Sequence, residues 1–163
     1  MESSIPTHLK HKPVMVVENY ANIDGRDAYA SNVQGLSVGL AQWNEHGRQD
    51  VSAKVWRKSG DKWSRLSEEL PLHRLLDLCI LYCSARAYFS EAYRFPNGYD
   101  ESDPNVQRIG LQGDAMNIAL CFDNPFLKED VEILRNTFAK DDEMLSERLF
   151  ALARLLKEMG FAR

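Results

Sequence analysis

The sequence has few cysteines and no long apolar run, and each shortage narrows the class of protein. Its three cysteines are an odd number, and two of them, Cys79 and Cys83, are four residues apart on one predicted helix. No stretch reaches the roughly 20 apolar residues that a membrane-spanning helix needs. The short polar start, Met1 to Pro6, does not have the pattern of a signal peptide. We therefore expect a cytoplasmic protein with reduced thiols and no membrane partner.

The common signatures of nucleotide binding and nucleophilic catalysis are also missing. The sequence has no Gly-x-Ser-x-Gly elbow, no Walker loop and no dinucleotide fingerprint, which excludes only the families that use them. His8 and His11 have ligand spacing but lie near the start, and the acidic loop 100–105 lacks the spaced ligands of a calcium loop. We predict no metal site and no cofactor.

The charge of the chain is unevenly spread. The formal net charge is −4, and the last 88 residues hold ten basic and fifteen acidic side chains, against ten and nine in residues 1–75. An acidic excess does not attract nucleic acid over long range, so a nucleic-acid partner is not expected. A local basic patch is still possible in the first half.

Hydrophobic patterning predicts strands early in the chain and helices late. Apolar or alternating runs predict strands at 14–17, 36–43, 51–58, 62–66 and 115–122. Helical spacing predicts a largely apolar, central buried helix from Pro71 to Tyr93, a second starting at Asn124-Pro125, and a third ending at Gly160. We predict one α+β domain over residues 1–163, with an antiparallel sheet of about four to five strands and three main helices packed on one face.

A β-hairpin is predicted to close at Gly60-Asp61, and its register fixes which side chains share a face. One face would then carry two indoles interleaved with three cations: Lys54, Trp56, Lys58, Trp63 and Arg65. Exposed indoles of this kind can stack bases or hold an anionic ligand. The alternative is that they form stabilising cross-strand pairs or that another element covers them.

A second group of polar residues lies where the hairpin leads into the helix. His73 and Asp77 are four residues apart on the predicted helix, and Glu69 comes just before it. A carboxylate beside an imidazole raises its basicity, so His73 is a candidate acid/base with Asp77 or Glu69 orienting it. The alternative is a local ion pair at the start of a helix.

The third candidate is the loop segment Asp24-Gly-Arg26. An arginine in an ordered loop can bind a carboxylate or phosphate through two hydrogen bonds, and Asp24 would lie beside it. The alternative is a turn in which Asp24 bonds its own backbone.

Three stretches resemble a known family. Residues 6–13 (PTHLKHKP), 18–26 (ENYANIDGR) and 63–74 (WSRLSEELPLHR) are similar to a family of small uncharacterised bacterial proteins, a domain of unknown function. The resemblance covers roughly the first ninety residues well and the rest loosely. It implies a bacterial cytoplasmic origin and brings no activity, cofactor or catalytic residue.

Three functional hypotheses remain, in order of preference. The first is a non-enzymatic binding or regulatory module, which the missing catalytic signatures favour, with a homodimer as one form it could take. The second is a small enzyme acting on a polar or anionic substrate, with His73 as acid/base and with Arg26 and Arg65 holding the anion. The third is single-strand nucleic-acid binding by the basic hairpin.

Overall fold

The computed structural model describes residues 5–26 and 28–163. The chain divides into two compact units, Met1–Leu78 and Cys79–Arg163. Each unit is described by itself below. The prediction that residues 1–163 form a single domain stays a prediction.

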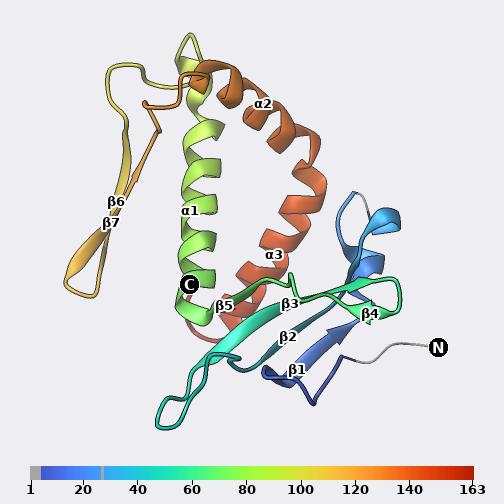
Figure 1. The fold of residues 1–163 in the computed structure, drawn as a ribbon. Coiled ribbons are helices and arrows are strands. Elements are labelled where there is room, and N and C mark those ends of the chain that lie inside the picture. The colour runs from blue at the N-terminus through green and yellow to red at the C-terminus, as the bar shows by residue number, and fades with distance from the viewer. Residues whose placement is uncertain (1–4, 27) are drawn as a thin grey trace. The chain divides into compact units, whose positions relative to one another are not determined.

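The first unit is built on a five-stranded antiparallel sheet (Figure 1). Its strands are β1 (Lys12–Glu18), β2 (Val33–Leu40), β3 (Val51–Ser59), β4 (Lys62–Trp63) and β5 (Glu69–Pro71). The first three strands pair in sequence order, and both β4 and β5 pair with β3. Two 3₁₀ turns, η1 (Tyr20–Ile23) and η2 (Ala28–Ala30), join β1 to β2. The strands predicted at 14–17, 36–43 and 51–58 are therefore confirmed within a few residues, whereas β5 was not predicted.

The predicted hairpin at Gly60-Asp61 is confirmed, but its second strand is shorter than expected. Lys58 pairs with Trp63, as predicted, and the ladder then stops. The reason is a serine turn: the Ser64 hydroxyl accepts from the Leu66 N–H at 3.0 Å, and the Ser67 hydroxyl donates to the Ser64 carbonyl at 3.2 Å. The chain rejoins β3 only at β5, so the predicted pair of Trp56 with Arg65 is wrong.

The sheet has two chemically different faces, which the register defines. One face, the apolar sheet face, joins residues paired across β1, β2 and β3: Met15, Val17, Leu36, Val38, Ala53 and Val55. The other, the polar sheet face, carries the residues between them: Gly35, Ser37, Gly39, Ser52, Lys54 and Trp56. Ile5 is buried and would meet a Cβ placed on Gly35, so the segment before β1 packs over the polar sheet face.

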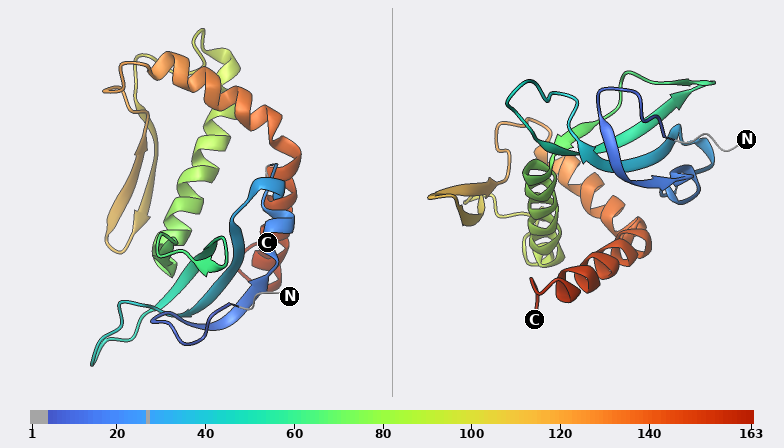
Figure 2. Two further views of the ribbon diagram at one scale, coloured as in Figure 1. Left: turned by 45° about the vertical axis from the view of Figure 1, so that its right-hand side comes forward. Right: turned by 90° about the horizontal axis from the view of Figure 1, so that it is seen from below.

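The second unit contains most of the helical residues. Helix α1 (Leu72–Ser90) begins in the first unit and continues into the second, where η3 (Ala92–Arg94), β6 (Asn105–Leu111), β7 (Asp114–Ala119), α2 (Leu127–Lys140) and α3 (Asp142–Glu158) follow. The β6–β7 hairpin stands on one side of α1, and α2 and α3 lie on the other (Figure 2). The third predicted helix is confirmed, with Asp141 at its N-cap and Gly160, at φ 87°, just past its end.

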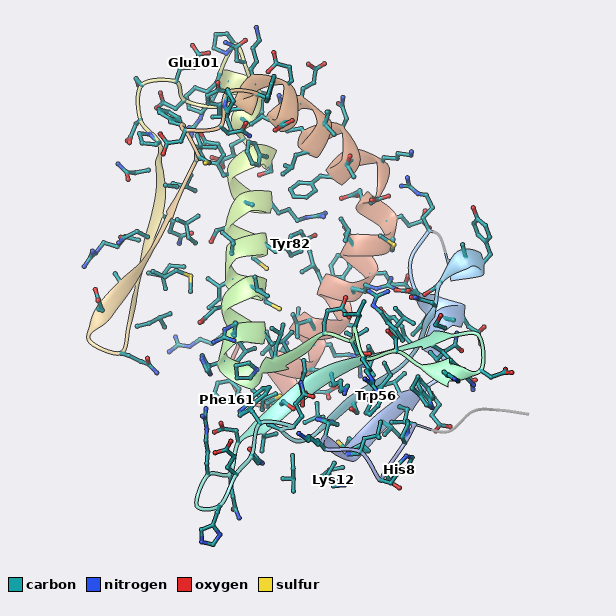
Figure 3. All side chains as sticks on the ribbon, viewed as in Figure 1. His8, Lys12, Trp56, Tyr82, Glu101 and Phe161 are labelled. Carbon is teal, nitrogen blue, oxygen red and sulfur yellow. The ribbon has the colours of Figure 1, made fainter. Side chains whose placement is uncertain are left out.

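Side chains of α1 connect it to both neighbours in the second unit. Tyr82 packs edge-on against Phe138 of α2, with ring centroids 5.9 Å apart (Figure 3). Ser84 donates to Gln107 of β6 at 3.0 Å. Only Ser84 of the nineteen residues of α1 is buried, so the predicted buried central helix is wrong. An apolar circumference needs neighbours on all sides, and these contacts cover only part of it.

The α+β prediction is confirmed by the five-stranded antiparallel sheet and the three helices. The strand interpretation of residues 115–122 is also confirmed, because β7 covers most of that run. The partner strand β6 was not predicted. None of the helices in the described part of the chain is long and apolar enough to cross a bilayer.

Candidate functional site

A buried polar cluster occupies the polar sheet face of the first unit. His11 Nδ1 lies 2.7 Å from Glu69 Oε1, and the two side chains are 0% and 1% exposed. Ser52 also donates to Glu69 Oε1 at 2.7 Å, and His11 Nε2 lies 2.9 Å from the hydroxyl oxygen of Ser37. Trp56 Nε1 donates to the same Ser37 oxygen at 2.8 Å. The cluster therefore ties the segment before β1 to β2, β3 and β5.

The direction of these hydrogen bonds follows from the chemistry of the groups. The Trp56 indole can only donate, so the Ser37 oxygen accepts from it and keeps its own proton to give. With a neutral imidazole, that proton goes to His11 Nε2, and the His11 Nδ1–H donates to Glu69. The resulting order is hydroxyl, imidazole, carboxylate, which is the order of a Ser–His–acid triad.

Burial argues against catalysis by this triad. A nucleophilic hydroxyl must reach its substrate, and Ser37 and His11 are both buried. The Ser37 oxygen is also occupied by the Trp56 indole. We interpret the cluster as a structural network, whose cost of burial is offset because its polar groups bond one another. Glu69 Oε2 is the exception, being buried with no hydrogen-bond partner in the described part of the chain.

A more open site lies where β3 begins and β5 passes into α1. It is a cavity of 480 Å³, within the range of roughly 300–1,000 Å³ typical of small-molecule sites. Its walls combine apolar and charged side chains: Trp43, Arg48, Asp50, Val51, Pro71, Leu72, His73 and Arg74. All of them belong to the first unit.

Positive charge exceeds negative charge in this cavity. Asp50 Oδ2 accepts from Trp43 Nε1 at 2.7 Å and from Arg48 Nε at 2.8 Å. These two hydrogen bonds hold the pKa of the Asp50 carboxyl below its ordinary value, and the one from Trp43 has the larger effect. The charge of His73 lowers the pKa a little further. The Arg74 guanidinium has no hydrogen bond or ion pair among residues 5–26 and 28–163. Arg74 is exposed, so its charge is accessible from solvent.

Replacing Trp43 with phenylalanine should raise the pKa of Asp50, because the variant loses the hydrogen bond that lowers this pKa most. Because the pKa of Asp50 is lowered in the folded state, its carboxylate stabilises the fold at pH values above the ordinary aspartate pKa. That contribution is lost as the pH falls through the pKa of Asp50 itself. A carboxyl-carbon NMR titration measures the shift. The Trp63→Phe variant is the control, and an equal shift there would contradict the assignment.

The structure separates the residues that the enzyme hypothesis placed together. Glu69 bonds His11 and not His73. The carboxyl group whose pKa the charge of His73 lowers is that of Asp50. Asp77 makes no hydrogen bond with His73 in the described part of the chain. Arg65 lies exposed in the loop between β4 and β5.

The candidate loop of Asp24 and Arg26 lies at the other end of the sheet from His73. The loop precedes the start of β2, where Val33 pairs with Arg57, whereas β5 reaches the far end of β3 at Ser52. Asp24 accepts a hydrogen bond from the Ser31 hydroxyl, which in turn accepts from the Val33 N–H at 3.0 Å. This is close to the alternative of a locally bonded turn.

On the hairpin face the predicted pairing of Lys58 with Trp63 is present, Trp56 is paired with Lys54 and not with Arg65, and the face is less open than predicted. Lys54 Nζ lies 4.2 Å from the Trp56 ring centroid, and Lys58 Nζ lies 5.5 Å from that of Trp63. Trp56 is only 1% exposed, and Trp63 packs edge-on against it with centroids 5.8 Å apart. Trp56 is therefore a core residue of the first unit and not a binding platform.

Sequence reasoning considered His11 only as a metal ligand, and it missed Ser37 and Ser52 of the cluster and Arg48 and Asp50 of the cavity. The cluster joins residues up to 58 positions apart, so no local spacing reveals it. One signal was present: Ser37 and Ser52 stand at inward positions of otherwise apolar or small-residue strands, where a hydroxyl needs a partner. No three His, Cys, Asp or Glu side chains gather to hold a metal ion within the described residues.

Comparison with known proteins gives a family match. The model of the "Family of unknown function (DUF6530)" matches residues 3–161, which is nearly the whole chain. No curated protein and no solved structure matches the chain.

Proposed function

The chain belongs to the DUF6530 family, whose function is unknown, and we propose that it is a non-enzymatic module that binds a small organic anion. The proposed site is the cavity at the junction of β5 and α1. The single observation that carries the proposal is the unpaired Arg74 guanidinium beside Arg48 and His73 in a cavity of ligand size.

The geometry of the cavity suits a carboxylate or phosphate group. Arg48 bonds Asp50 through Nε, which leaves its two terminal nitrogens free to donate. Arginine forks bind carboxylate and phosphate with two parallel hydrogen bonds. The first turn of α1 contains no acidic residue, and Asp77 in the next turn makes no ion pair with Arg74 within the described residues. Val51, Pro71 and Leu72 offer an apolar wall to the body of the ligand.

Replacing Arg74 with glutamine should weaken anion binding about tenfold or more, since a hydrogen bond to a charged group contributes about 1.5 kcal/mol or more. Two probes test this: inorganic phosphate, and benzoate, which joins a carboxylate to a flat apolar ring. Amide NMR signals of residues 48–51 and 72–75 should shift saturably with at least one of them.

The matched control is Arg65→Gln, which removes an exposed arginine of the same unit outside the cavity. That variant should bind as the unmodified protein does. Shifts that do not saturate with either probe would overturn the proposal, as would equal losses of affinity in the two variants. Stronger binding of benzoate than of phosphate would identify a carboxylate with an apolar body as the ligand class.

A second candidate function is an enzyme that uses the same cavity, with His73 as acid/base. The observation that favours it is that His73 lines the cavity with Asp50, whose carboxylate lies near enough for the charge of His73 to lower its pKa slightly. Incubating the protein with an organic anion that it binds distinguishes the binding module from the enzyme. Recovery of the anion unchanged supports a binding module, and conversion that is lost in His73→Asn supports an enzyme.

Single-strand nucleic-acid binding has less support. Base stacking needs an accessible ring face, and Trp56 is buried. The net charge of −4 also opposes attraction to a polyanion.

A further inference from the structure

The cavity of the proposed anion site has two walls, which come from separate parts of the first unit. One wall is the β2–β3 connection, residues 41–50, which contributes Arg48. The other is the passage from β5 into α1, residues 71–74, which contributes Arg74. Because the two arginines stand on opposite walls, a ligand that bonds both of them depends on the distance between the walls.

The β2–β3 connection is bonded to itself. The Asp50 carbonyl accepts from the Ala41 N–H at 3.0 Å and from Asn44 Nδ2 at 3.1 Å, and Asn44 Oδ1 accepts from the Asp50 N–H at 2.8 Å. The side chains of Trp43 and Arg48 donate to the Asp50 carboxylate. These hydrogen bonds hold the shape of the connection, but none of them attaches it to β5 or α1.

A single hydrogen bond attaches the connection to the opposite wall. The Gln42 N–H donates to Glu69 Oε1 at 3.1 Å, and Glu69 begins β5, two residues before Pro71 of the cavity. Within the described part of the chain, no other hydrogen bond or ion pair joins the connection to β5 or to the first turn of α1. The connection is otherwise anchored only where it joins β2 and β3.

The Glu69 carboxylate is itself held firmly. Its Oε1 also accepts from His11 Nδ1 and from the Ser52 hydroxyl, each at 2.7 Å, and its side chain is 1% exposed. Glu69 does not line the cavity, so it acts on a ligand only through the connection that it holds.

We propose that Glu69 is a positioning residue for the anion site: it fixes the β2–β3 connection through the Gln42 N–H and so sets the distance between Arg48 and Arg74. This inference rests on the proposed function, because it concerns the same cavity. A site whose walls are already fixed loses less conformational freedom on binding, so it binds its ligand more tightly. All of the residues involved belong to the first unit.

Gln42→Pro tests the proposal, because it deletes the N–H and leaves the charge of Glu69 in place. The Asn44 N–H donates to the Ala41 carbonyl at 3.2 Å, which makes Gln42 the second residue of a β-turn, where proline is favoured. Gln42→Ala is the matched control, since it loses the same exposed side chain but keeps the N–H. The proline variant should bind benzoate or phosphate about two- to tenfold more weakly than the alanine variant, the factor expected for one hydrogen bond.

Amide NMR titrations with benzoate and with phosphate measure the two variants and the unmodified protein. Equal dissociation constants in the two variants, with saturable binding by the unmodified protein, overturn this inference and leave the proposed function standing. Absence of saturable binding by the unmodified protein overturns the proposed function, and this inference with it.

Hydrogen exchange of the unmodified protein gives a second readout that requires neither a variant nor a ligand. Gln42 and Trp43 are adjacent residues of one turn, and the Trp43 N–H has no hydrogen bond in the part of the chain that the structure describes. After correction for intrinsic rates, the Gln42 amide should exchange at least about tenfold more slowly than that of Trp43, because Glu69 accepts its hydrogen bond. Equal exchange of the two amides overturns the proposal, whatever the anion titrations give.

Discussion

Replacing Glu69 with alanine is expected to lower the free energy of unfolding by about 2–5 kcal/mol, because two buried donors, on His11 and Ser52, lose their acceptor at about 1–3 kcal/mol each. Glu69 Oε1 accepts from His11, from Ser52, and from the Gln42 N–H at 3.1 Å. The variant leaves the buried donors of His11 and Ser52 without their acceptor, whereas the exposed Gln42 N–H can bond water instead. Urea denaturation followed by tryptophan fluorescence measures the loss.

The adjacent residue provides the control. Glu68 binds Arg57 through two nitrogens, but its side chain is 52% exposed, so water replaces the lost contact. Glu68→Ala should therefore lower the free energy of unfolding by less than about 1 kcal/mol. His11→Ala should resemble Glu69→Ala, and the double variant should lose less than the two single losses combined. Equal effects at positions 68 and 69 would contradict the proposed structural role of the cluster.

Gly39→Ala is expected to cost about 3 kcal/mol or more, because the added methyl group meets backbone and not a movable side chain. A Cβ on Gly39 would lie 1.9 Å from the Lys12 carbonyl oxygen and 2.8 Å from the Pro13 Cα. β1 and β2 would have to separate at this point to admit it. Thermal unfolding followed by circular dichroism measures the loss.

Gly110→Ala is the matched change in a strand of the second unit. The nearest atom to its added Cβ is the Asp114 carbonyl oxygen at 3.9 Å, an ordinary contact distance. This variant should change the free energy of unfolding by no more than about 1 kcal/mol. If Gly39→Ala were as stable as Gly110→Ala, the close approach of β1 to β2 would be refuted.

Local chemistry explains which parts of the fold could be predicted from the sequence. The turn at Gly60-Asp61 sets the register of its own hairpin, because Gly60 adopts a φ of 60° that glycine tolerates. The register fails beyond Trp63, since Ser64 and Ser67 divert the chain through side-chain bonds to nearby backbone. β6 was missed because a register shift between Asn105 and Gln107 breaks its alternation.

The candidate sites were less predictable because they depend on contacts between distant residues. Glu69 was recognised as a chemically capable residue, but its partner His11 lies 58 positions earlier. His73 was recognised too, but its predicted arginine partners, Arg26 and Arg65, do not line the cavity. The arginine that the β2–β3 connection brings there is Arg48. Pairing across a sheet decides such neighbours, and sequence spacing does not contain that information.

The irregular start of β1 has a consequence for how far the protein can assemble. β1 is an edge strand, and the register shift between Pro13 and Met15 interrupts its regular spacing. Proline has no N–H to offer a further strand, and a bulge twists the edge away from flat pairing. Growth of a fibril by strand addition is thus discouraged at this edge.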